Sequence, residues 1–149
     1  MFKNILVPTD GSQFSQDTAR RAVSFAKEAG ARLTVFYAKH HTPEYFWGKG
    51  AWVHLPEPHK LEEFAEQEAQ NILQFVENLC KEAGVACTKM TLTSDVVHEA
   101  IIDAATQCGC DLIFMASHGR RGLNALVLGS ETNKVLTHSK IPVLVYRRD

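Results

Sequence analysis

The sequence has almost no net charge and no long apolar segment. Its 16 Lys and Arg residues are balanced by 17 Asp and Glu residues, and this excludes the strongly basic surface of a sequence-independent nucleic-acid binder. No apolar run approaches the ~20 residues that a membrane-spanning helix needs. The first residues contain no apolar stretch of signal-peptide length and no small-residue cleavage site. We therefore expect one soluble, cytoplasmic domain over residues 1–149, with no membrane or nucleic-acid partner.

Cysteine is also scarce, and its spacing is uninformative about metals. Cys80, Cys87, Cys108 and Cys110 match neither a Cys-x-x-Cys pair nor a zinc-binding pattern. We expect buried free thiols in a reducing compartment. The closely spaced pair Cys108 and Cys110 invites a redox interpretation, but Gly109 is better explained as the residue that ends a helix.

Apolar runs alternate with amphipathic stretches along the whole chain. Continuously apolar strands separated by helices are typical of a parallel sheet that is covered on both faces. The pattern thus predicts an α/β, doubly wound sheet. The expected strands are Ile5–Pro8, Leu33–Ala38, Val85–Leu92, Leu112–Met115 and Pro142–Tyr146; the expected helices are Ser15–Ala29, Leu61–Ala83, one capped by Asp95, and Ser130–His138.

Residues 39–59 are predicted to form one irregular insertion. The segment holds four histidines and four aromatic residues, and loops of this length are usually functional or disordered. The histidines match no metal-site template, and no metal site is predicted. The segment is better interpreted as a flap over a ligand or as a surface for a partner chain.

In a doubly wound sheet, ligands bind at the carboxyl ends of strands where the winding reverses. The turns after the first and fourth strands, residues 8–11 and 116–129, therefore hold the candidate site. Gly119 and Gly129 leave backbone amides accessible to an anion, and a helix that begins at Ser130 adds its positive dipole end. The alternative is that these glycines form ordinary strand-to-helix turns.

These motifs resemble the universal stress protein family. Its nucleotide-binding members carry Gly-x-x-Gly, nine residues, then Gly-Ser or Gly-Thr. Here Ala116-Ser117-His118-Gly119 and Gly129-Ser130 match this pattern at every marked position but Ala116. The opening Ile5–Ser12 and the ending Val135–Val145 are similar to the family's first strand and its last helix and strand.

The resemblance implies a Rossmann-like fold of the adenine nucleotide alpha hydrolase type, with sheet order 3-2-1-4-5. It also implies ATP, ADP or AMP as ligand, with Mg²⁺ as a possible companion, and a homodimer formed through the last strand. The implied nucleotide-binding residues are Pro8, Thr9, Asp10, Ala38, Met115, Ala116, His118, Gly119, Gly129, Ser130, Glu131 and Thr132. Arg120 and Arg121 are candidate phosphate contacts or simply solvated side chains, and Pro142, Val143, Leu144, Val145 and Tyr146 are the implied dimer contacts.

Three functions remain open. The first is a nucleotide-binding regulatory module of the stress response. The second is an interaction protein that has lost nucleotide, because Ala116 replaces the first motif glycine. The third is a weak ATPase, for which the sequence offers no Walker lysine and no evident base beyond Asp10.

Overall fold

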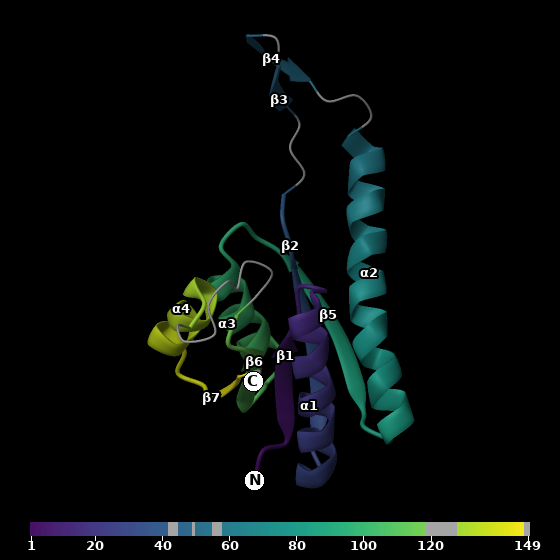
Figure 1. The fold of residues 1–149 in the computed structure, drawn as a ribbon, viewed down its shortest axis with the longest axis vertical. Helices are drawn as coiled ribbons and strands as arrows, with labels where there is room; N and C mark the ends of the chain where they lie inside the picture. The colour runs from purple at the N-terminus through teal and green to yellow at the C-terminus, as the bar shows by residue number, and fades with distance from the viewer. Residues whose placement is uncertain (42–44, 49, 55–57, 119–127, 148–149) are drawn as a thin grey trace.

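A computed structural model describes residues 1–41, 45–48, 50–54, 58–118 and 128–147. The helices and strands alternate along most of the chain (Figure 1). In order they are β1 (Asn4–Pro8), α1 (Gln13–Ala29), β2 (Arg32–Lys39), β3 (Tyr45–Gly48), β4 (Ala51–His54), α2 (Pro58–Ala83), β5 (Cys87–Thr93), α3 (Val97–Gln107), β6 (Leu112–Ala116), α4 (Ser130–His138) and β7 (Val143–Tyr146).

The main sheet has five parallel strands in the order β5-β2-β1-β6-β7. This is the predicted order 3-2-1-4-5, since β3 and β4 pair only with each other. β1 is the central strand, and its residues Ile5, Leu6 and Val7 are completely buried. Burying one such side chain stabilises the fold by about 1.5–3 kcal/mol.

Helices cover both faces of this sheet, and the core is divided accordingly. Ile5 and Val7 belong to the cluster under α1 and α2, together with Val23 and Val76. Leu6 points the other way, into the cluster that α3 and α4 cover. This alternation follows from the two-residue period of a strand, and it confirms the doubly wound architecture.

The prediction of a wholly irregular segment from 39 to 59 is wrong. Lys39 ends β2, and Pro58 already begins α2. Between them β3 and β4 form an antiparallel hairpin in which Trp47 lies opposite Trp52. Aromatic residues favour extended backbone, and Gly50 supplies the positive φ of 77° at the turn. The hairpin lies beyond the N-terminal end of α2, away from the main sheet (Figure 1).

The prediction that Asp95 caps a helix is also wrong. α3 follows Val96, which makes no side-chain capping bond. The Asp95 carboxylate instead accepts a hydrogen bond from the backbone N–H of His41 at 3.2 Å and lies 3.1 Å from its Nδ1. Asp95 thus joins the start of the hairpin segment to the β5–α3 connection.

Several element boundaries shift by a few residues because helix ends are closed by specific bonds. α1 begins at Gln13 rather than Ser15, since Ser12 accepts the Ser15 N–H at 3.2 Å as the N-cap. β5 begins at Cys87 rather than Val85, because the Val85 N–H closes the end of α2. Pro142 precedes β7.

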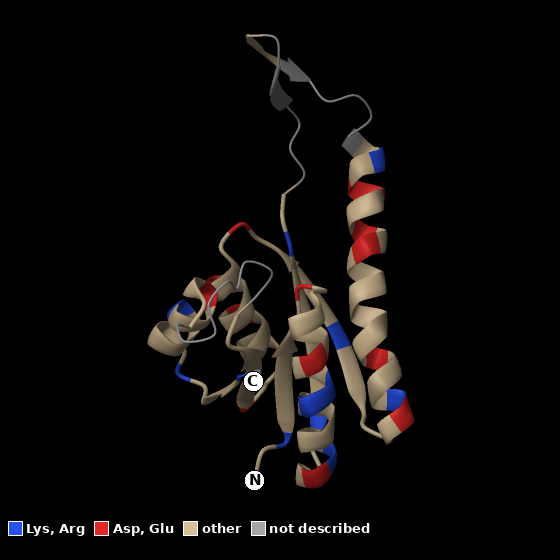
Figure 2. Ribbon diagram, viewed as in Figure 1, with Lys and Arg blue, Asp and Glu red and all other residues tan. Residues whose placement is uncertain are grey.

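None of the helices in the described part of the chain is long and apolar enough to cross a membrane. Basic and acidic side chains are interspersed along α1 and α2 (Figure 2).

Candidate functional site

The turn after β1 is built around a chain of side-chain bonds. The N–H of buried Thr9 donates to the Phe36 carbonyl at 2.9 Å, and its hydroxyl lies 3.0 Å from that of Ser15. Gly11 has a φ of 80°, so the turn needs a residue that adopts the left-handed region without strain. Asp10 accepts the Ser12 N–H at 2.9 Å. These bonds hold Asp10 at the carboxyl edge of the sheet, as the sequence predicts.

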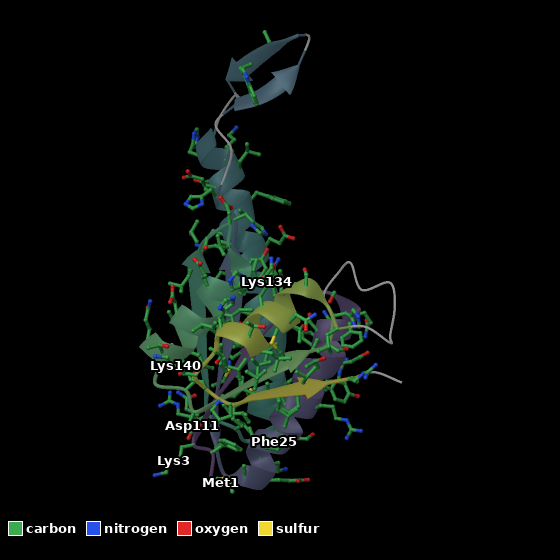
Figure 3. The ribbon with its side chains drawn as sticks, turned by 90° about the vertical axis from the view of Figure 1, so that its left-hand side faces the viewer. Met1, Lys3, Phe25, Asp111, Lys134 and Lys140 are labelled. Atoms are coloured by element: carbon green, nitrogen blue, oxygen red, sulfur yellow. The ribbon has the colours of Figure 1, made fainter. Side chains whose placement is uncertain are left out.

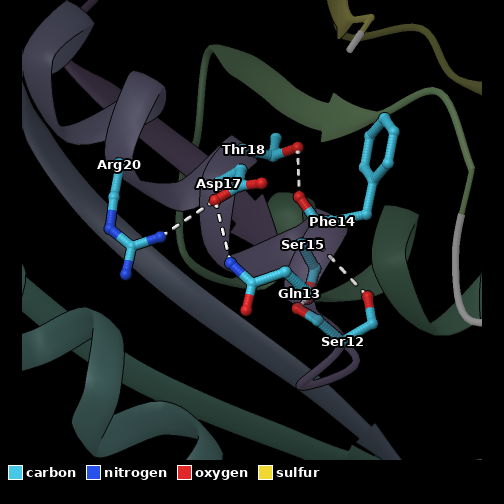
Figure 4. A network of polar contacts seen from close by, with 7 residues as sticks. All are labelled: Ser12, Gln13, Phe14, Ser15, Asp17, Thr18 and Arg20. Atoms are coloured by element: carbon cyan, nitrogen blue, oxygen red, sulfur yellow. Dashed lines mark hydrogen bonds and ion pairs between the residues drawn. The ribbon is translucent and has the colours of Figure 1, made fainter.

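Figure 4 shows how the first turn of α1 continues this arrangement. Ser12 caps the helix through the Ser15 N–H, and the Thr18 hydroxyl donates to the Phe14 carbonyl at 2.9 Å. Asp17 accepts from Gln13 and pairs with Arg20. Ser12 and Ser15 are not among the predicted site residues, although Ser12 is a recognisable N-cap signal.

The second half of the site is the junction between β6 and α4. The Ser117 N–H donates to the Tyr146 carbonyl at 2.9 Å, and the Ser117 carbonyl accepts the Gly129 N–H at 2.7 Å. The buried Thr132 hydroxyl contacts two carbonyl oxygens, those of Ala116 at 2.9 Å and Ser117 at 3.2 Å. The first turn of α4 is therefore fixed directly to the end of β6.

Gly129 is required here by close packing rather than by its backbone angles. Its φ of −62° and ψ of 154° suit any residue. A Cβ at this position, however, would lie 3.1 Å from the Ser117 carbonyl oxygen and 3.3 Å from the His118 Cα. Both neighbours are backbone atoms, so neither can rotate away.

Ala116 occupies ordinary strand backbone. It is the last residue of β6 and lies opposite Tyr146 in the parallel register with β7. Extended backbone has a negative φ and accepts a Cβ without strain. The replacement of the family's glycine by Ala116 thus carries no conformational cost.

His118 connects the two halves of the site. Its ring lies 6.4 Å from that of Phe14, centroid to centroid, in an edge-on arrangement. Its Nδ1 is 3.1 Å from the Ser117 hydroxyl. Phe14 lies in the first turn of α1, so this contact joins the β1–α1 side to the β6–α4 side.

Glu131 is engaged away from the expected phosphate position. Its carboxylate accepts the backbone N–H of His98 at 2.9 Å and lies 3.6 Å from the Lys134 ammonium. His98 is the second residue of α3, so Glu131 acts as the missing cap of that helix. The side chains of Glu131 and Thr132 are therefore both used within the protein.

The remaining predicted residues fall into three groups. Pro8, Ala38 and Met115 lie at or next to the carboxyl ends of β1, β2 and β6, and Met115 is 6 % exposed within the core. Ser130 is the exposed first residue of α4. Gly119, Arg120 and Arg121 lie outside the described residues. Among the residues that are described, no three His, Cys, Asp or Glu side chains form a group that could hold a metal ion.

The model of the Universal stress protein family matches residues 1–147. The chain belongs to this family. It is 34% identical to a universal stress protein of Thermus aquaticus over 99% of this chain and 100% of that protein. It is 31% identical to universal stress protein MJ0531 of Methanocaldococcus jannaschii over 99% of this chain and 84% of that protein.

Solved structures of universal stress proteins have the same fold. That of MJ0577 superposes with a TM-score of 0.75 at 26% identity, covering 100% of this chain and 98% of that one. A universal stress protein in complex with cAMP superposes with a TM-score of 0.72 at 20% identity, covering 99% of each chain. A family member from Arabidopsis thaliana with AMP bound gives 0.65 at 17% identity, covering 99% of this chain and 92% of that one.

Proposed function

We propose that this universal stress protein binds an adenine nucleotide, ATP or its ADP or AMP relatives, between the β1–α1 turn and the start of α4. The observation that carries the proposal is that both turns lie at the carboxyl edge of the sheet, on the neighbouring strands β1 and β6. β1 is the strand from which the chain winds in both directions, and ligands of doubly wound sheets bind at this place.

The amino end of α4 supplies the chemistry that phosphates need. The first amides of a helix have no intrahelical acceptor, and the helix dipole makes this end attractive to anions. The Gly129 N–H is already used by the Ser117 carbonyl. The amides that follow it, at Ser130 and Glu131, are therefore the proposed phosphate donors, with Mg²⁺ accompanying a triphosphate. Gly119, Arg120 and Arg121 remain proposed contacts on the sequence alone.

The opposite side of the site is proposed to hold the nucleoside. Asp10 carries a carboxylate that can accept hydrogen bonds from ribose hydroxyls or from the adenine amino group. The backbone of Pro8 and Thr9, with Ala38 and Met115, would line the base. The cAMP and AMP complexes of proteins with this fold support an adenine ligand. Occupancy of the site would then regulate the protein's interactions, which makes it a binding module rather than an enzyme.

The test begins with protein purified without added nucleotide. We expect adenine nucleotide in the supernatant after denaturation, or heat release when ATP and magnesium are titrated in. Asp10→Asn keeps the acceptor for the Ser12 N–H but loses the charge, and should weaken binding about tenfold, as for one charge-assisted bond. Asp17→Asn, which lies within α1 and is paired with Arg20, is the matched control and should bind normally.

Ala116→Gly separates the nucleotide-binding module from the interaction protein that has lost nucleotide. If the native protein binds nothing and Ala116→Gly binds ATP, the chain is an interaction protein that has lost its ligand. If neither binds, the proposed site is wrong. Equal binding by both agrees with the strand backbone of Ala116.

We further propose that two copies associate through β7. This strand pairs only with β6 and forms the edge of the main sheet, where unpaired backbone groups favour strand addition. Pro142 and Tyr146 accept hydrogen bonds from β6 and the residue that follows it, so the alternate residue Val145 directs its N–H to the outer edge. Light scattering should give twice the monomer mass for the native protein, and Val145→Pro should lower the mass to that of one monomer. A monomeric native protein would refute the assembly.

A further inference from the structure

Two cysteines lie together at the end of the molecule opposite the proposed nucleotide site. Cys80 is in the last turn of α2 and is completely buried, while Cys87 is the first residue of β5 and is partly buried. Cys87 packs against the core cluster that contains Cys80. The expectation of four buried thiols is correct for Cys80 and Cys110, whereas Cys87 and Cys108 are only partly buried.

The strand register places Cys87 on the face that α2 covers. Met90 and Leu92, at the alternate positions of β5, pack against the cluster under α3, so Cys87 faces the other way. An ion pair next to the two cysteines also joins α2 to β5. Glu77, one turn before Cys80, lies 3.7 Å from Lys89, two residues after Cys87.

The connection between the two cysteines is closed by backbone bonds. The Val85 N–H donates to the Cys80 carbonyl at 2.9 Å, and the Gly84 N–H donates to the Lys81 carbonyl at 3.3 Å. Gly84 has a φ of 75°, which completes a Schellman ending of α2. The turn therefore holds the end of the helix directly against the start of β5.

The two thiols have different acidities because they contact each other. The neighbouring Cys80 thiol lowers the pKa of Cys87, although partial burial acts in the opposite direction. The Cys87 thiol itself donates to the Thr88 carbonyl at 3.9 Å. The contact between the two thiols, together with burial, raises the pKa of Cys80. The more accessible sulfur is thus also the one that more readily becomes a thiolate, the form that reacts with oxidants.

We propose that Cys80 and Cys87 are a reversible oxidation site for hydrogen peroxide, in which Cys87 reacts first and Cys80 resolves it into a disulfide. The Cys87 thiolate attacks one peroxide oxygen, the O–O bond breaks, and with one proton the products are a sulfenic acid and water. Cys80 then attacks the Cys87 sulfur, and its thiol proton leaves with the hydroxyl group as a second water. Overall, two thiols are oxidised by two electrons and one peroxide is reduced to two waters.

The other two cysteines are poorer candidates and serve as the internal control. The Cys108 thiol donates to the Met90 sulfur at 2.9 Å. Burial raises the pKa of Cys110 to about 11. Burial also raises the pKa of Cys108, so both thiols are less acidic than usual, whereas the pKa of Cys87 is lowered.

The test treats the native protein with equimolar hydrogen peroxide, blocks remaining thiols by alkylation, and maps peptides by mass spectrometry. We expect a peptide pair joined through Cys80 and Cys87 that is lost after dithiothreitol, with unchanged yield in the Cys108→Ser/Cys110→Ser variant. In Cys80→Ala the disulfide should be lost, and dimedone should label Cys87. Cys80→Ser is a second form of this variant should the alanine protein fold poorly.

Three results would overturn the proposal. The first is full alkylation of Cys80 and Cys87 after peroxide treatment, and the second is a disulfide between Cys108 and Cys110 instead. The third is dimedone labelling of Cys80 in a Cys87→Ser variant at the rate at which Cys87 is labelled in Cys80→Ala. Each readout is independent of nucleotide binding, so the two proposals succeed or fail separately.

Discussion

Replacing Gly129 with alanine tests how tightly β6 and α4 are joined. The added methyl would lie 3.1 Å from the Ser117 oxygen and 3.3 Å from the His118 Cα, so the Ser117–His118 backbone must move by a few tenths of an ångström. Overpacking of this kind costs about 1–3 kcal/mol. Because the angles at Gly129 suit alanine, we place the loss of unfolding free energy near the middle of this range, at about 2 kcal/mol.

Urea unfolding measures this loss, and nucleotide titration measures its effect on the site. The displaced Ser117 carbonyl accepts the Gly129 N–H at 2.7 Å, so the same movement tilts the start of α4. We therefore expect nucleotide affinity to fall together with stability.

Gly30→Ala is the matched control for this variant. Gly30 has a φ of 66° and no atom within 4 Å of its Cβ position. It lies just before β2, at the amino-terminal ends of the strands and away from the proposed site. Its replacement should cost about 1 kcal/mol through backbone strain alone and leave the affinity unchanged. A Gly129→Ala protein that unfolds at the native urea concentration would refute the close approach, and equal affinity losses in both variants would refute a local effect.

Two further variants test the polar contacts that fix the sheet ends. Thr132→Val keeps the side-chain volume but removes the hydroxyl that contacts the Ala116 and Ser117 oxygens; chemical denaturation should show a loss of about 1–2 kcal/mol, and no loss would mean that water replaces the hydroxyl. Asp111 lies next to Lys3 near the N-terminus (Figure 3) and accepts the Lys3 and Asn4 amides. Although partial burial opposes it, these bonds lower the pKa of Asp111. A lowered folded-state pKa means that the stabilisation is present above the ordinary aspartate value and is lost as pH falls through the folded value. Thermal unfolding from pH 7 to 2 should therefore show a weaker acid dependence for Asp111→Asn than for the native protein, and identical slopes would contradict this assignment.

The sequence predicted the main sheet because each of its strands is a short apolar run bounded by a turn signal. Ile5, Leu6 and Val7 are apolar in succession since both faces of β1 are covered, and strands of this kind are typical of parallel sheets buried between helices. The hairpin of β3 and β4 was missed because its strands are only four residues long. Their aromatic residues also suit a flap or a surface for a partner chain, and period-two alternation is weak over so few positions.

The candidate site was predicted as a location but not as a set of contacts. Glycines and a helix start were enough to select the two turns. Sequence spacing could not show that Glu131 caps α3, because its partner His98 is 33 residues away. In the same way Asp95 has the residue type and position of an N-cap, but its carboxylate accepts the N–H of His41, two residues after β2.

Glu131 and Thr132 are consecutive residues that serve different elements, one the first turn of α3 and the other the end of β6. α4 therefore cannot detach without uncapping α3 and releasing the last carbonyls of β6. Amide protons in the first turns of these two helices should exchange with solvent in a single opening event, as a cooperative unit smaller than the whole domain. The nine residues of α4 would thus control the local opening of a much larger part of this half of the molecule.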